Sequence, residues 1–316
     1  MTGRRVALSV VIMVLAVAGV LVAVFWRGGT EPQGSPPAGS VTDLPAGWRW
    51  EAYGGIEVQV PADWGYGTTN TPPCLTREKS KPYIGRPGAV PLIKCSGPPV
   101  PALDLRAPYL WFSTKGTDGA QTYDGGWVAE TRTVGATTFT VFSDDPTLRA
   151  RILGSARPAT GTKDTDCPAD HPATKNHDAR PDPGKPGLTG NLESMTICRY
   201  SLTDRRSGPA MLSTSRLTGA EAAAVANAIL AAPEGTGPDS PENCAAEYAY
   251  GDELLVLRIP GGTEVFVRYS GCVGHGFDDG HIRRRLTADA VRPLLSGPHS
   301  PMSLIGPVAE LVWGVK

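Results

Sequence analysis

The richest polar cluster in the 316-residue sequence is His275-Gly-Phe-Asp-Asp-Gly-His281, which places two imidazoles and two carboxylates within seven residues. These groups are ligand types that zinc or another divalent ion accepts. The cluster lies on a glycine-rich connection, where solvated polar side chains are common, and its spacing fixes no coordination geometry. A solvated loop is therefore the favoured interpretation, and the sequence predicts no metal site.

Other groups could also bind ligands, and each has a simpler structural explanation. Arg283-Arg284-Arg285 could contact anionic envelope polymers or lipid head groups, but a strand with outward charges explains the run. Five tryptophans could stack on a glycan, yet core filling accounts for most of them: Trp48, Trp50, Trp64, Trp111 and Trp127. His171 and His177 lie in a polar, proline-rich stretch and are expected to be solvated.

Familiar catalytic motifs are missing from the sequence. It contains no GxSxG, SxxK, HExxH or GxxxxGK[ST] pattern and no complete EF-hand loop. The motifs therefore indicate no catalytic, cofactor-binding or metal-binding residue and no cofactor. A net charge of −1 gives no reason to expect a nucleic-acid partner.

The chain begins with an apolar run, Val6 to Trp26, that carries no charge. As a helix it would extend about 30 Å, enough to cross the hydrocarbon core of a bilayer. Arg4 and Arg5 precede it, so we expect a cytoplasmic tail of residues 1–5 and an extracytoplasmic remainder. A cleaved signal peptide is the alternative, but its apolar region would normally be shorter. Residues 27–46 are rich in Pro, Gly and Ser and predict a disordered stalk.

Six cysteines follow this run, and none precedes it. An even number of cysteines on the oxidising side of a membrane predicts three disulfides. Six cysteines allow fifteen pairings. We favour the nearest-neighbour set Cys74–Cys95, Cys167–Cys198 and Cys244–Cys272.

Residues 47–157 predict a first α+β domain. Gly54-Gly55 separates Trp48–Tyr53 from Ile56–Val60, which indicates a hairpin whose Ile56, Val58 and Val60 face the core. A strand is expected over Tyr109–Ser113, and a second hairpin over 126–133 and 137–143. Asp145-Pro146 predicts a capped helix that ends near Ser155.

The segment YGGIEVQVPADWG, followed by central strands, a hairpin and a helix ending in ILGSAR, resembles the Mog1/PsbP-like α/β/α sandwich. The resemblance covers roughly residues 48–157 and implies a binding or assembly module, with no catalytic residues to assign. The whole chain, with 22 Arg against 8 Lys, resembles single-pass membrane-anchored extracytoplasmic proteins of actinobacteria.

Residues 158–190 predict a flexible linker, and residues 191–316 a second α+β domain. In that domain 198–218 resembles 267–287: Arg-Tyr-Ser and Arg-Leu-Thr recur at matching positions. Thr218 with Glu221 forms a predicted capping box for a helix over 219–232, and Thr287 a cap for a shorter helix. A hairpin is expected over 253–259 and 263–269, and a final strand or short helix over 304–313.

The sequence thus predicts an α+β protein with an N-terminal transmembrane helix, a stalk and two small disulfide-stapled domains built on antiparallel sheets. The favoured function is a non-catalytic binding or scaffold module at the cell envelope. A sensor or accessory subunit of a membrane signalling system and an envelope hydrolase are the alternatives. Expected partners are the membrane, through the N-terminal helix, and an envelope protein, glycan or lipid.

Overall fold

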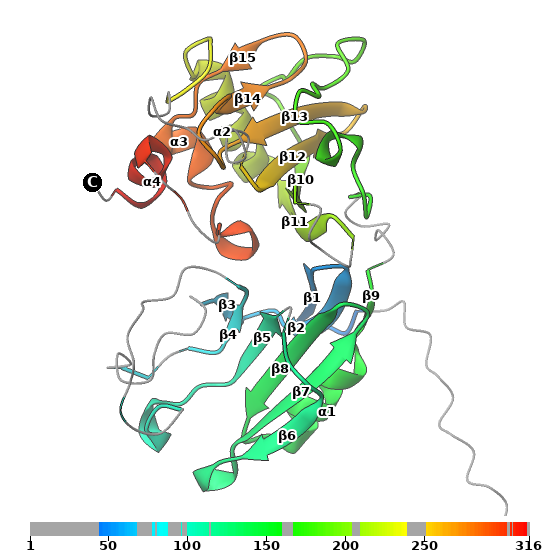
Figure 1. The fold of residues 1–316 in the computed structure, drawn as a ribbon, viewed down its shortest axis with the longest axis vertical. Coiled ribbons are helices and arrows are strands. Elements are labelled where there is room, and N and C mark those ends of the chain that lie inside the picture. The colour runs from blue at the N-terminus through cyan, green and yellow to red at the C-terminus, as the bar shows by residue number, and fades with distance from the viewer. Residues whose placement is uncertain are drawn as a thin grey trace, which may run out of the picture. The chain divides into compact units, whose positions relative to one another are not determined.

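The computed structural model describes residues 44–67, 78–79, 81–87, 96, 100–113, 115–159, 167–203, 209–238, 251–301, 304 and 306–314. The predicted anchor over residues 6–26, its cytoplasmic tail, most of the stalk and the pair Cys74–Cys95 lie outside these residues. Within the described part of the chain, no helix combines the length and apolarity that a membrane span requires. The fold is α+β, with mainly antiparallel sheets (Figure 1).

The first hairpin forms as predicted, from β1 (Trp48–Tyr53) and β2 (Ile56–Pro61). The short strand β9 (Arg157–Pro158) pairs with β2 and completes a three-stranded sheet. Ile56, Val58 and Val60 are buried, which confirms the predicted core face. Glu57 is also buried although it alternates with these residues, because Arg157 on the adjoining strand donates to its carboxylate at 2.5 Å.

A six-stranded sheet follows, in the order β3-β4-β5-β8-β7-β6. Its strands are β3 (Gly65–Tyr66), β4 (Tyr83–Gly85), β5 (Tyr109–Ser113), β6 (Gly119–Thr122), β7 (Val128–Val134) and β8 (Thr137–Ser143), with the short 3-10 helices η2 (Leu103–Leu105) and η3 (Asp124–Gly126) between them. The β7–β8 hairpin confirms the prediction. The expectation of antiparallel sheets is wrong at one edge, where β3 pairs parallel with β4 and β4 parallel with β5.

Helix α1 (Pro146–Gly154) packs against β8 and β2 and buries Ile152 and Leu153. The predicted cap is present, since Asp145 Oδ1 accepts hydrogen bonds from the backbone N–H groups of residues 147 and 148 at 2.8 and 3.1 Å. The cap fixes where the helix begins, and proline at its first position needs no hydrogen-bond partner.

The second half of the chain builds a six-stranded antiparallel sheet in the order β11-β10-β12-β13-β14-β15. Its strands are β10 (Ser194–Ser201), β11 (Met211–Thr218), β12 (Glu253–Ile259), β13 (Thr263–Arg268), β14 (Gly276–Asp278) and β15 (Arg283–Arg284). Helices α2 (Gly219–Ala231), α3 (Ala288–Val291) and α4 (Gly306–Trp313) share the apolar core on one face, and η6 (Gly297–His299) precedes α4. The predicted β12–β13 hairpin is confirmed, and the C-terminal segment forms a helix.

The two segments of the predicted repeat share a strand, a link and a helix entry, and the duplication itself stays a prediction. The predicted threonine caps are wrong: neither Thr218 nor Thr287 makes a side-chain cap hydrogen bond. Thr218 is still paired in β11, and Gly219 turns the chain with φ of +55°, so the hydroxyl is not aimed at the first turn of α2.

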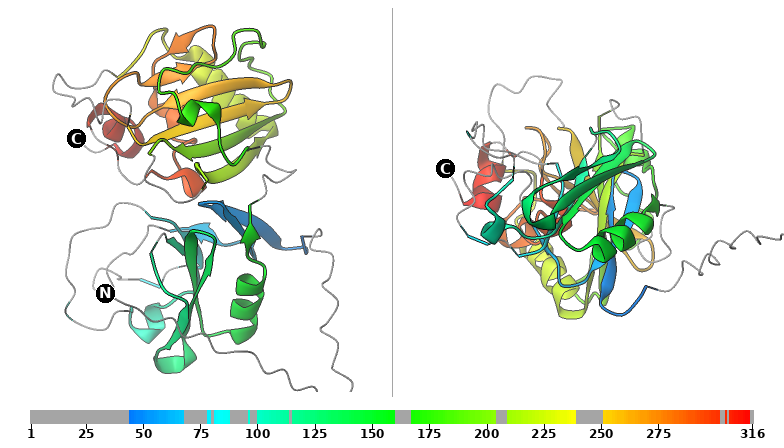
Figure 2. Two further views of the ribbon diagram at one scale, coloured as in Figure 1. Left: turned by 45° about the vertical axis from the view of Figure 1, so that its right-hand side comes forward. Right: turned by 90° about the horizontal axis from the view of Figure 1, so that it is seen from below.

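Residues 167–179 pack on the other face of the sheet, and Leu188 reaches the core on the helix-covered face, so the expectation of a flexible linker is wrong for this stretch. Figure 2 shows the green segment crossing the strands. The predicted Cys167–Cys198 disulfide is present and joins the segment to β10. The 3-10 helix η4 (Pro172–Thr174) follows it, and both sulfurs lie in an apolar cluster with Tyr200 and Phe266. Cys272 is also disulfide-bonded, and its predicted partner Cys244 lies outside the described residues.

Candidate functional site

A pocket of about 240 Å³ lies at the β13–β14 edge of the second sheet. One wall is formed by residues 177–179 of the strap, by which we mean residues 177–188. The rest of the lining comes from Thr236, from β13, β14 and β15, and from the link between β13 and β14. Most of its side chains are ionisable or polar. The lining residues are His177, Asp178, Ala179, Thr236, Arg268, Val273, Gly274, His275, Gly276, Phe277, Asp278 and Arg283.

Polar contacts hold the strap to this edge along its whole length. Arg180 donates through Nε and Nη2 to the Asp278 carboxylate at 2.7 and 2.8 Å. The Lys185 carbonyl accepts from His281 Nε2 at 2.8 Å, and the Pro186 carbonyl accepts from the Thr263 hydroxyl at 2.8 Å. The strap is therefore held against the sheet by hydrogen bonds of strap residues that lie outside the pocket lining.

Glycine is required at two places beside the pocket. Gly280 has φ of +88°, and a Cβ there would stand 2.7 Å from the Pro181 carbonyl oxygen of the strap. Gly276 has φ of +150°, and a Cβ there would stand 2.6 Å from the Arg284 carbonyl oxygen. A side chain at either position would separate backbone segments that form the pocket.

Asp278 is the central carboxylate of this region. Its Oδ1 accepts from Arg180 Nη2 and from the Gly280 backbone at 2.9 Å, and its Oδ2 accepts from Arg180 Nε and from Arg283 Nε at 3.1 Å. Burial raises the pKa of this carboxyl, but these donors outweigh burial and hold the pKa below its ordinary value. Asp278 is therefore an ionised group that accepts hydrogen bonds from several protein donors, and this makes it a poor proton acceptor for a substrate.

Arg268, His275 and Arg283 each carry N–H donors at the pocket lining. Arg268 Nη2 donates to the Ala179 carbonyl of the strap at 2.9 Å. His275 is buried, and its Nδ1 lies 3.0 Å from the Pro238 carbonyl, so that nitrogen carries the proton. Arg283 is half exposed and bonds Asp278 through Nε.

The polar residues between His275 and His281, which stand out in the sequence, have different surroundings in the structure. The prediction of a solvated loop is wrong for His275 and Asp278, which are both buried. Asp279 accepts from the backbone N–H groups of residues 188, 281 and 282 and so shapes the turn. His281 is exposed and bonds the strap, away from His275. Among the described residues, no three His, Cys, Asp or Glu side chains converge on a point where a metal ion would sit.

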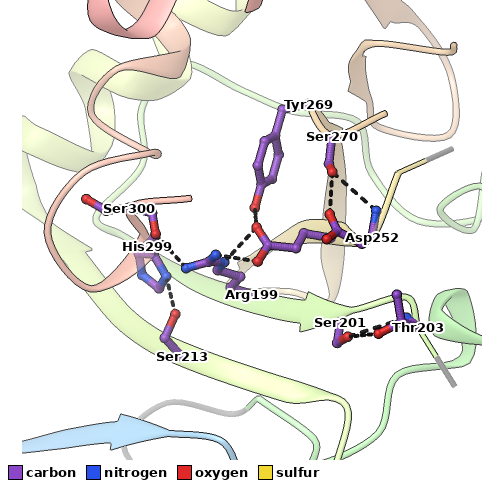
Figure 3. A network of polar contacts seen from close by, with 10 residues as sticks. Arg199, Ser201, Thr203, Ser213, Asp252, Tyr269, Ser270, His299 and Ser300 are labelled. Atoms are coloured by element: carbon purple, nitrogen blue, oxygen red, sulfur yellow. Dashed lines mark hydrogen bonds and ion pairs between the residues drawn. The ribbon is translucent and has the colours of Figure 1, made fainter. Parts of the chain in front are cut away.

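A second network of polar side chains, around Arg199, is buried against the same sheet (Figure 3). The Arg199 guanidinium pairs with the Glu253 carboxylate, Tyr269 donates to Glu253 Oε2 at 2.6 Å, and Arg199 Nη1 donates to the Ser300 carbonyl at 2.8 Å. All three interacting side chains are buried. Burial raises the pKa of Tyr269 well above its ordinary value, and the Glu253 charge adds to this, so the phenol remains a donor.

Beside this group, His299 lies between two serine hydroxyls. Ser213 Oγ is 2.9 Å from Nδ1, and Ser215 Oγ is 2.6 Å from Nε2. Burial lowers the pKa of His299 well below its ordinary value, as does the positive charge of Arg199. A serine beside a histidine can form a nucleophile and base, but Ser213 is 0% exposed and His299 1%. No substrate atom can reach this pair in the folded protein, so we assign it to the core.

The first half contains a comparable buried charge. Glu51 accepts from Arg86 at 2.5 Å, from Arg49 at 2.7 Å and from the Tyr66 hydroxyl at 2.7 Å. Burial raises the pKa of Glu51, and the nearby guanidiniums outweigh burial and hold it below its ordinary value. These residues anchor β1 to β3 and β4 and are expected to act structurally.

Two of the five tryptophans fill the core, as predicted, and the other three are half-buried. Trp64 and Trp127 are buried, and Trp111 is half-buried on β5. Trp48 and Trp50 are half-buried on β1, and the guanidiniums of Arg151 and Arg157 lie 3.7 and 4.0 Å from their ring centroids. These arginines occupy ring faces that a sugar would need for stacking.

Several residues in this half of the chain either differ from the sequence expectation or carry no pattern that marks them in the sequence. His171, expected to be solvated, is buried and lies 3.2 Å from Glu264, whereas His177 is exposed. No pattern in the sequence around Arg180 or Arg268 marks either residue as part of a site. Of the arginine run, Arg283 lines the pocket, Arg284 donates to the Ala232 carbonyl at 3.1 Å, and Arg285 is exposed.

Comparison with protein-family models, curated proteins and solved structures found no match to this chain. The resemblances to the Mog1/PsbP-like fold and to actinobacterial envelope proteins therefore stay predictions.

Proposed function

We propose that the chain is a non-catalytic binding module of the cell envelope, held at the membrane by residues 6–26 with its sheets on the outer side. Support for the location comes from the uncharged apolar run behind Arg4 and Arg5. The Cys167–Cys198 disulfide adds support, because such bonds persist mainly in oxidising compartments.

The observation that carries the binding role is a contrast within the second half of the chain. Ser213 is bonded to His299, Arg199 is paired with Glu253, and all four side chains are buried. The side chain of Arg283, in contrast, is 49% exposed and lines an open pocket. Groups suited to covalent chemistry are thus inaccessible, while groups suited to recognition face solvent.

Rigidity of the pocket favours the same conclusion. The Arg180–Asp278 pair fixes the strap, and the Cys167–Cys198 bond fixes the chain just before it. A site whose walls are already in place avoids the entropic cost of ordering them when a ligand binds.

The test uses the full chain in lipid nanodiscs, screened by thermal unfolding against soluble peptide and glycan fragments of the cell envelope. A ligand at about 100 times its Kd adds roughly 2.7 kcal/mol of stability. For a protein of this size that corresponds to a rise in Tm of about 4–5 °C. The bound fragment should be recovered unchanged when it is analysed by mass spectrometry.

Two results would contradict the proposal. Conversion of the fragment to a product, abolished by Ser213→Ala, would indicate a hydrolase instead. A C-terminal epitope that stays protected when protease is added to intact cells would exclude the extracytoplasmic location.

A further inference from the structure

The charged groups around the pocket differ in how many of their hydrogen-bonding atoms already have protein partners. Three guanidiniums surround it, those of Arg268 and Arg283 in the lining and that of Arg180 behind Asp278. Two carboxylates line it, those of Asp178 and Asp278. The nearby carboxylate of Asp279 is not part of the lining and accepts backbone N–H groups. The lining by itself thus holds two guanidiniums and two carboxylates, so the ligand class depends on which of these groups still have free hydrogen-bonding atoms.

Asp278 cannot serve a cationic ligand, because its two oxygens already accept four hydrogen bonds from Arg180, Arg283 and the Gly280 backbone. The N–H groups of Arg283 have fewer protein partners than the oxygens of Asp278. Within the described residues, the only side-chain partner of Arg283 is Asp278, which it contacts through Nε. The four N–H donors at the end of that guanidinium are thus left for a ligand, in the fork geometry that matches a carboxylate or phosphate.

Size and surroundings limit the ligand further. About 240 Å³ lies just below the range of pockets that hold drug-sized molecules. Val273, which is 47% exposed, and Phe277 give the lining an apolar side next to the guanidiniums. The space therefore suits a short organic molecule or the end of a chain, and is too small for a folded partner.

We propose that this pocket binds a small organic anion, whose carboxylate or phosphate is held by the terminal N–H groups of Arg283 while its carbon chain contacts Val273. This inference rests on the proposed binding function and names the ligand class for that site. Arg268 contributes positive charge, and the Arg180–Asp278 pair keeps the Arg283 side chain oriented through its Nε.

The experiment measures binding by isothermal titration calorimetry with the full chain in nanodiscs. Succinate and glycerol 3-phosphate are the anionic probes, and glycerol is the uncharged one. The test variant is Arg283→Gln, which removes the charge while Asp278 keeps its bonds to Arg180 and Gly280. The matched control is Arg285→Gln, an equal change of charge at an exposed residue outside the pocket lining.

We expect at least one anion to bind, with Arg283→Gln weakening it roughly 10- to 100-fold, the range for a lost hydrogen bond to a charged group. Arg285→Gln should change the affinity by less than about twofold, and glycerol should not bind. The tighter of the two anions shows whether the site prefers carboxylate or phosphate.

The inference is overturned if glycerol binds as well as the anions, if both variants weaken binding equally, or if neither anion binds at millimolar concentration. An uncharged envelope fragment that still raises Tm in the thermal screen would then leave the binding function standing without this ligand class.

Discussion

Replacing Tyr269 with phenylalanine tests whether the buried charge group holds the second sheet together. Tyr269 donates to Glu253 Oε2 at 2.6 Å, and neither residue has appreciable exposure. The substitution removes this one hydrogen bond and keeps the ring in the core. The carboxylate is not left uncompensated, because Arg199 still contacts both of its oxygens.

The expected loss follows from the charge on the acceptor. A hydrogen bond to a charged group contributes about 1.5–3 kcal/mol, against about 1 kcal/mol for one between neutral groups. Tyr269→Phe should therefore lower the free energy of unfolding by about 2 kcal/mol. Removing the whole carboxylate side chain would cost more, because Arg199 would then be a buried charge without its partner.

Tyr200→Phe is the matched control. Tyr200 occupies the corresponding position of the predicted repeat, is equally buried, and donates to the neutral Pro168 carbonyl at 3.0 Å. It should cost only about 1 kcal/mol. Native-state hydrogen exchange of backbone amides in β10 and β12 measures both losses in the sheet concerned.

The prediction fails if the two phenylalanine variants lose the same stability, because the charge of Glu253 would then add nothing to the hydrogen bond. It also fails if adding Tyr269→Phe to Glu253→Gln costs as much as adding it to the wild type, since a double-mutant cycle must show coupling between partners in contact.

Three further changes test other parts of the second half. Gly280→Ala should speed amide exchange across the strap, whereas Gly261→Ala, at a similar positive φ with open space around it, should not. Because the pKa of His299 is lowered, the unfolded chain takes up a proton below pH of about 6.5 that the folded chain does not. Stability measured by urea unfolding should thus fall as pH decreases, by up to about 1.4 kcal/mol per unit, and His299→Gln should flatten this slope. Replacing Cys167 and Cys198 together by serine should cost about 3–4 kcal/mol in the same assay, and an unchanged midpoint would contradict the disulfide's role.

Local elements were predictable because their causes lie within a few residues. Two glycines between alternating strands were enough to predict the β1–β2 hairpin, and Asp145-Pro146 predicted the start of α1. Turn and cap preferences depend on backbone geometry and on the nearest side chains, which the sequence states directly. The capping box at Thr218 failed because the strand pairing of β11 continues through this residue.

The candidate site was predictable only in part. The residue types of His275, Asp278 and Arg283 mark them as candidates, but their spacing in the sequence does not predict how they are arranged in the structure. Arg180 reaches Asp278 across 98 residues of sequence, and nothing around Arg180 distinguishes it from a solvated linker residue. The pairing of a polar segment with a sheet edge is a long-range event that leaves no periodic pattern in either segment.

The sequence by itself determined the apolar run, the even set of cysteines, the correct Cys167–Cys198 pair and most of the hairpins. Tertiary structure alone decided that residues 167–179 cover a sheet face, that two strand pairs in the first half are parallel, and that Arg199 and Glu51 are buried with their partners. The physical reason is that turns and amphipathic strands are encoded locally, whereas a buried charge is tolerated only where distant residues supply its counter-charge and hydrogen bonds.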